Sequence, residues 1–155
     1  FHQGDNWFTV DGTLRFPHTR YQALTLEELL TPRGSISFEL ALNALDELLT
    51  DASGEVYASG QFEGLLSEPN LSINADISQA KVFDVTVKQG TVSASVDGLD
   101  DFATNVEADF QRIVVAGNAV QSLKLNAQGD AESHQASVTL KSDTLNTAHV
   151  INGSL

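Results

Sequence analysis

The sequence predicts an all-β fold, and three observations support this prediction. From about Glu55 onward, short runs alternate apolar and polar residues, as in Leu71–Ser78, and such alternation places the apolar side chains on one face of a strand. The runs recur at a spacing of about ten residues with turn residues between them. Strand-like runs do not alternate with long helical patterns, so a βαβ fold is not predicted.

Composition limits the classes of function. The chain has 155 residues, enough for one domain. It carries 8 Lys and Arg against 21 Asp and Glu, a formal charge of −13, which disfavours nucleic-acid binding. We interpret the acidic excess as a solubilising surface. Without cysteine or methionine, the chain has no disulfide, thiolate nucleophile or cysteine-based metal site.

The N-terminal third, residues 1–53, is predicted to mix strands with short helices. Apolar residues from Phe8 to Phe16 share one parity through Gly12, which predicts a strand with a bend or a hairpin there. Ser35–Leu42 alternates again and predicts a second strand.

Two short helical segments are expected in the same third. Thr25 and Glu28 have the spacing of a capping box, and the helix must stop before Pro32. Asn43–Leu49 combines a possible cap with leucines at helical spacing.

Residues 54–155 read as regular strands. Turns are expected at Ser67–Asn70 and at four dipeptides: Gln89-Gly90, Asp97-Gly98, Gln128-Gly129 and Asn152-Gly153. Ile113 and Val115 take the parity opposite to Phe110, which predicts a turn or bulge near Gln111 and Arg112. Gly60 and Gly64 are expected to mark bulges or bends that curl the sheet.

No catalytic residue, cofactor or metal site is predicted, and the protein is not expected to be an enzyme. His134 is interpreted as structural, because no H-x(3)-H or HExxH spacing exists. Trp7 is expected to be a half-buried aromatic residue. The other residues weighed were His2, His18, His149 and the turn residues Asp5, Asp100 and Asp101, together with Gly98 and Gly129, which form no nucleotide-binding motif.

The apolar residues of these strands allow two interpretations: the core of a closed sandwich without a ligand, or an uncovered face that holds something apolar. The residues assigned to this surface are Val56, Phe62, Leu71, Ile73, Ile77, Val85, Val87, Val92, Val96, Val106, Phe110, Leu123, Leu125, Val138 and Leu140.

Two stretches carry a resemblance to a known family. Val56–Ile77 has the order strand, Gly, strand, Pro, strand, and Ser122–Leu140 has an apolar strand, Gly, and a His that opens the next strand. Both resemble the TamB family of bacterial cell-envelope proteins, within the wider AsmA-like group. The resemblance covers about residues 54–155. It implies a curved, U-shaped, taco-like sheet with an apolar concave groove.

What the resemblance implies for function is phospholipid transport between the inner and outer membranes. The alternative is assistance in assembling outer-membrane β-barrel proteins with an Omp85-type partner. Residues 1–155 are interpreted as one excised interior segment, in the periplasmic part of an inner-membrane-anchored protein. The anchor and the barrel contact would lie outside this segment. The expected partners are acyl chains and not nucleic acid; sheltering a chain of about 16 carbons from water is worth roughly 13 kcal/mol.

Overall fold

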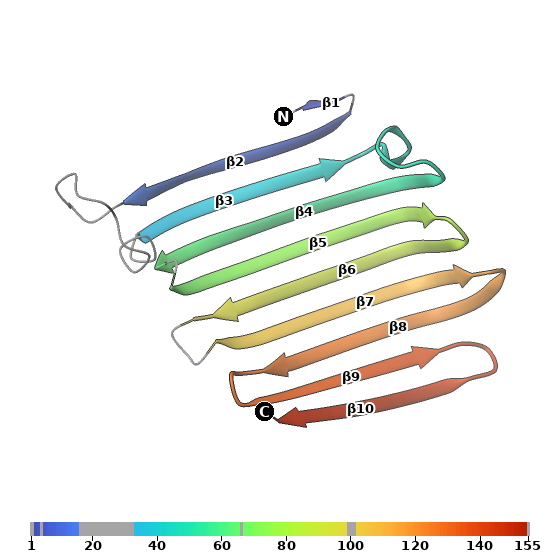
Figure 1. Ribbon diagram of the computed structural model, residues 1–155. Coiled ribbons are helices and arrows are strands. Elements are labelled where there is room, and N and C mark those ends of the chain that lie inside the picture. Colours follow the sequence, from blue (N-terminus) through green and yellow to red (C-terminus); the bar gives the residue numbers. More distant parts are fainter. Residues whose placement is uncertain (1, 4, 16–32, 66, 99–101, 155) are drawn as a thin grey trace.

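A computed structural model describes residues 2–3, 5–15, 33–65, 67–98 and 102–154. These residues form one antiparallel sheet of ten strands whose spatial order follows their order in the chain (Figure 1). The strands are β1 (His2–Gln3), β2 (Asn6–Arg15), β3 (Arg33–Leu42), β4 (Ala52–Leu65), β5 (Glu68–Val82), β6 (Val85–Asp97), β7 (Ala103–Val115), β8 (Asn118–Gly129), β9 (Ser133–Lys141) and β10 (Asn146–Ser154).

The all-β prediction is therefore confirmed, whereas the helical predictions are not. No α-helix occurs in the described residues, and Asn43–Leu49 holds only a 3-10 turn, η1 (Leu45–Glu47). The run is too short to build an α-helix, because its first turn costs more than one hydrogen bond returns. The helix expected after Thr25 falls within 16–32, outside the described residues.

The sheet is a single layer. Figure 1 shows the strands side by side, and no described helix or strand lies over either face. Consequently the buried apolar residues of the described chain are few: Ala41, Leu45, Ala52, Ala58 and Ile113. A closed sandwich would bury its large inward-facing side chains between two sheets, so that interpretation is wrong for the described residues. The U-shaped cross-section is not confirmed.

Pairing between neighbouring strands sets which side chains share a face, because directly opposed residues of an antiparallel pair point the same way. One row across the sheet is Phe8, Leu40, Ala58, Ala75, Val92, Ala108, Leu125 and Val138. An adjacent row, on the other face, is Tyr57, Asp76, Thr91, Asp109, Lys124 and Thr139. We call the two sides the apolar face and the polar face.

Two expected turns lie inside strands instead. Gln89-Gly90 lies in the middle of β6, and Asn152-Gly153 lies in β10. At Gly90 the missing side chain makes room for a neighbour rather than for a turn: an added Cβ would lie 2.6 Å from Cδ1 of Phe110 on β7. The β5–β6 hairpin instead turns at Phe83, whose φ is 52°. The strands are accordingly longer than the sequence pattern indicated.

A line of irregular residues crosses the sheet where the apolar parity changes. We call this line the border row: Gly54, Gln79, Lys88, Arg112 and Gln121. Gln79, Lys88 and Arg112 are skipped by the ladders on both sides of them, Gly54 by the β4–β5 ladder and Gln121 by the β7–β8 ladder. Gln79 and Arg112 have positive φ, 49° and 54°, a conformation uncommon for residues with a side chain. The irregularity predicted near Arg112 is thus confirmed, within a continuous β7.

Candidate functional site

The apolar face brings together all the predicted lining residues except two. By register, the residues that share it are Val56, Phe62, Leu71, Ile73, Ile77, Val92, Val96, Val106, Phe110, Leu123, Leu125, Val138 and Leu140. All of them are half-buried, because each is flanked by strand neighbours but covered by no second layer. The result is a contiguous hydrocarbon surface that extends across the sheet from β4 to β9.

Val85 and Val87 lie elsewhere. They precede the border-row residue Lys88 at the start of β6 and are in phase with Gln89 rather than with Gly90. Val87 pairs with Ala80 and Ile113, so these two valines belong to a second, smaller apolar cluster at the border end of the sheet. The sequence showed the change of parity but not that β6 carries it within one strand.

The apolar face also extends over strands that the sequence prediction left out. Phe8 on β2 and Ile36, Phe38 and Leu40 on β3 share it. The rings of Phe8 and Phe38 are 6.4 Å apart between centroids and tilted by 45°, within the range of favourable aromatic pairs. The signal was available, since the same alternation is present in Ser35–Leu42.

Glycines on the apolar face lie beneath large side chains of the adjacent strand. Phe38 occupies the space that a Cβ on Gly60 would need, and Leu14 does the same at Gly34. Gly60 pairs regularly with Phe38 and Ile73, so the bulge predicted there is wrong. The glycines let large side chains lie flat, which keeps this surface continuous.

Gly64, by contrast, has a φ of 107° at the end of β4. L-residues rarely adopt this conformation, so the prediction of a local bend is confirmed at this glycine.

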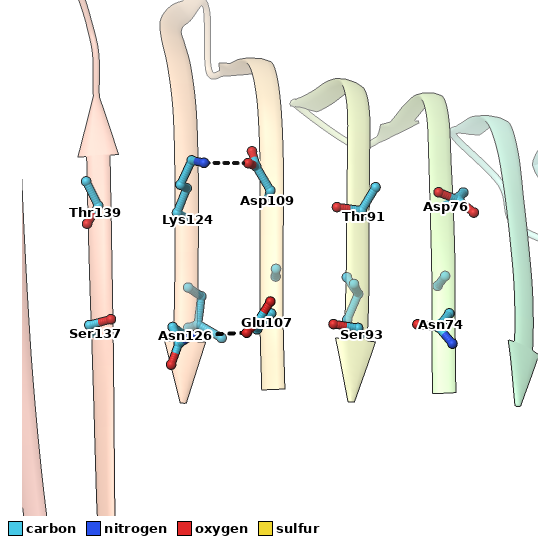
Figure 2. A pocket seen from close by; sticks show the side chains of 14 residues that line it. Asn74, Asp76, Thr91, Ser93, Glu107, Asp109, Lys124, Asn126, Ser137 and Thr139 are labelled. Carbon is cyan, nitrogen blue, oxygen red and sulfur yellow. Dashed lines mark hydrogen bonds and ion pairs between the residues drawn. The ribbon is translucent and has the colours of Figure 1, made fainter. Parts of the chain in front are cut away.

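The polar face is charged and hydrogen-bonded, as Figure 2 shows. Lys124 Nζ lies 2.8 Å from Oδ2 of Asp109, and Asn126 Nδ2 donates to Oε1 of Glu107 at 3.4 Å. The hydrogen bond and the charge of Asp109 raise the pKa of Lys124. The second carboxylate oxygen of Asp109, Oδ1, is buried without a partner.

Hollows in the structure lie over the polar face. One of about 680 Å³ is lined by Asp76, Ser93, Glu107 and Lys124, among others (Figure 2). Short side chains such as Ser93 leave space between longer ones, which accounts for the depression. The predicted apolar groove is not confirmed, and the apolar face is a half-buried surface that no second layer of the described residues covers.

The remaining residues singled out from the sequence take structural positions. His134 opens β9 opposite Gly129, where its Nδ1 lies against the glycine. Trp7 is half-buried on β2, as predicted. The backbone oxygen of Asp5 accepts a hydrogen bond from Asn43 at 2.8 Å. His18, Asp100 and Asp101 lie outside the described residues, and within those residues no three His, Asp or Glu side chains are grouped to hold a metal ion.

Comparison with known proteins decides the family. The family model described as "TamB, N-terminal domain" matches residues 23–155. The chain belongs to the TamB family. The family signal covers the ladder from β3 to β10, so the apolar face lies almost entirely within the TamB match. Comparison with curated proteins and with solved structures finds no match.

Membership of the TamB family identifies the chain as part of a cell-envelope protein and connects it with a translocation and assembly or lipid-transport module. No helix among the described residues is long and apolar enough to cross a membrane.

Proposed function

We propose that the apolar face of this TamB segment carries phospholipids across the periplasm, between the inner and outer membranes, without enzymatic activity. The single observation that supports this most is the uncovered, half-buried hydrocarbon surface that follows the sheet through successive strands. Exposed apolar surfaces of this extent are unfavourable in water unless something apolar covers them. Acyl chains are the ligand that such a featureless surface suits, since it offers no specific polar contacts.

The energetic argument favours a continuous surface over a pocket. Each methylene shielded from water contributes about 0.8 kcal/mol, so an acyl chain gains from every strand it crosses. A lipid can then move from one strand to the next without losing more than a few methylene contacts at a time. Neighbouring strands lie about 4.8 Å apart, which makes each such step small.

The finer features of the proposal are a U-shaped cross-section and a periplasmic position in an inner-membrane-anchored protein. The glycines of the apolar face support curvature toward that side, since Gly60 and Gly90 have no side chain to resist bending. With acyl chains bound, the sheet would close around them and shield the remaining exposed side of each acyl chain from water.

A second candidate function is a scaffold for outer-membrane β-barrel proteins, acting with an Omp85-type partner. It is favoured by β10, whose outer edge pairs with no described strand and which carries no Asp, Glu, Lys or Arg. Uncharged edges are receptive to an added strand. In this case the edge, rather than the apolar face, would be the functional surface.

Photo-crosslinking discriminates between the two. A photoreactive residue at Ile73 lies on the apolar face between Gly60 and Ala94, and one at Ser72 lies on the polar face of the same strand. Phospholipid transport predicts crosslinks to lipid from position 73 and none from position 72. Native mass spectrometry of the purified chain should show co-purified phospholipid. A chain that stays empty at Ile73 and captures unfolded barrel strands would favour the scaffold instead.

A further inference from the structure

The alternation of side chains is out of phase on the two sides of the border row. On β7, Phe110 and Ile113 flank Arg112 and lie three positions apart, whereas unbroken alternation would separate two apolar residues of one face by an even number of positions. The same spacing recurs at matching positions of the neighbouring strands. The flanking positions are Ile77 and Ala80 on β5, Gly90 and Val87 on β6, Phe110 and Ile113 on β7, and Leu123 and Val120 on β8.

Between these flanking positions, each strand carries two successive polar residues. They are Ser78-Gln79, Lys88-Gln89, Gln111-Arg112 and Gln121-Ser122. All are exposed except Ser122, which is half-buried. Nη2 of Arg112 donates to Oε1 of Gln89 at 2.6 Å, and Gln89 is in phase with the polar-face residue Thr91. The guanidinium of Arg112 therefore lies on the polar side, like the side chain of Gln111, and its φ of 54° accompanies the reversal.

A strand that bends can place two successive residues on its outer side, because that side is the longer one. Exposure gives the direction of the bend. Flanking strands alone leave Phe110 and Leu123 half-buried, but Ile113 is only 6% exposed. Ile113 therefore has additional cover, which the inner side of a bend provides. In Figure 2 the ribbons of β6 and β7 change direction just beyond Thr91 and Asp109, toward the border row.

We propose that the border row is a corner of the sheet, at which the strand ends turn toward the apolar side and form a second wall of the lipid-carrying surface. This inference rests on the proposed lipid-carrying function and adds residues to its binding surface. An acyl chain that lies across the strands in the corner contacts both walls, so more of its methylenes leave water than on a flat face. The second wall consists of Ala80, Val85, Val87, Ile113, Val115 and Val120.

Two pairs of neighbouring residues distinguish a corner from unbroken alternation. On β6, unbroken alternation would place Thr86 in phase with Gly90 on the apolar side, whereas the corner places Val87 there. On β7, Val114 and Val115 are identical exposed side chains that the corner assigns to opposite sides. A photoreactive residue is introduced at each of these four positions in the full chain, which is irradiated with vesicles of phosphatidylethanolamine and phosphatidylglycerol. Positions 87 and 115 should capture about fivefold more lipid than positions 86 and 114, which face water.

A photoreactive residue at Ile73 separates the two proposals, because it lies on the apolar face far from the border row. If position 73 captures lipid but positions 86 and 114 capture as much as 87 and 115, or more, the second wall is overturned and the lipid-carrying function stands. If position 73 captures none, the lipid-carrying function fails, and the second wall fails with it as a lipid site.

The bend itself is measured without lipid. The chain contains no cysteine, so spin labels attach only at Glu68→Cys and Asp84→Cys, which lie at the two exposed ends of the β5 segment. Sixteen residue steps of straight strand would span about 53 Å, and a right-angled corner at Gln79 would shorten this to about 40 Å. Electron-spin distance measurement should give the shorter value; a distance near the straight-strand value would overturn the corner.

Discussion

The ring of Phe38 on β3 lies over Gly60 on β4, in the space that a Cβ at position 60 would occupy. The two residues pair directly across the strands. Phe110 covers Gly90 in the same way between β7 and β6. These pairs make the apolar face smooth, because an aromatic ring fills the gap that the glycine leaves. The arrangement depends on glycine and not merely on a small residue.

Gly60→Ala is therefore expected to destabilise the chain by about 1–3 kcal/mol, the usual cost of adding a methyl group where no space exists. Gly153→Ala is the control, since a Cβ at Gly153 would meet no atom within 4 Å. It should change stability by less than about 0.5 kcal/mol. Urea unfolding followed by circular dichroism measures both, and equal stability of the two variants would contradict the proposed role of Phe38.

A charge on the apolar face should abolish lipid binding without unfolding the sheet. Ile73→Asp and Val106→Arg each place a charge among acyl chains, which is unfavourable because the charge must then leave water. Both positions are only half-buried, so the free chain can still solvate the new side chain. Ser72→Asp, on the polar face of β5, is the control and should bind lipid normally. Fluorescent-lipid binding checks the prediction; loss of binding in all three variants would argue against a specific face.

The sequence was sufficient to predict the strands and their common apolar side. Alternation such as that of Leu71–Ser78 is a local property, and pairing preserves it from strand to strand. Turns were harder to predict, because a glycine such as Gly90 serves equally well in a turn or beneath a ring. Only the position of Phe110 on the next strand distinguishes these roles, and that position is a result of folding.

The separation of Val87 from Val92 also depends on pairing rather than on local pattern. Hydrophobicity does not distinguish the two valines, and only the register of Val87 with Ile113 does so.

Asn6 is expected to stabilise the connection between β2 and η1. Its side chain is 2% exposed; Oδ1 accepts from the backbone N–H of Ala44 at 3.0 Å, and Nδ2 donates to the oxygen of Ala44 at 3.1 Å. Asn6→Ala removes the acceptor of the Ala44 N–H and one of the two donors to the Ala44 oxygen, which still accepts from the N–H of Glu47 at 3.3 Å, and should cost about 1–3 kcal/mol. Asn74→Ala, at an exposed position of β5, should have little effect. Urea unfolding of the two variants measures the difference, and equal midpoints would contradict it.

The hairpin between β8 and β9 should lose stability in acid through one carboxylate. Asp130 Oδ1 accepts hydrogen bonds from the backbone N–H groups of Glu132 and Ser133, each at 2.8 Å. These bonds lower the pKa of Asp130 below its ordinary value of 3.8. Because the pKa of Asp130 is lower in the folded chain than in the unfolded chain, the stabilisation is fully present at a pH above the unfolded pKa. It is lost as the pH falls through the folded pKa.

Carboxyl NMR titration of Asp130 should accordingly give a pKa below 3.8, and unfolding midpoints should fall only at lower pH. Asp130→Asn keeps an oxygen that can accept the two backbone hydrogen bonds but carries no charge. Protonation at position 130 should therefore no longer lower the stability of this variant in acid. Asp130→Ala loses the bonds as well and should be less stable than Asp130→Asn at neutral pH. An unshifted titration of Asp130 would show that the two backbone N–H groups do not hold the carboxylate in solution.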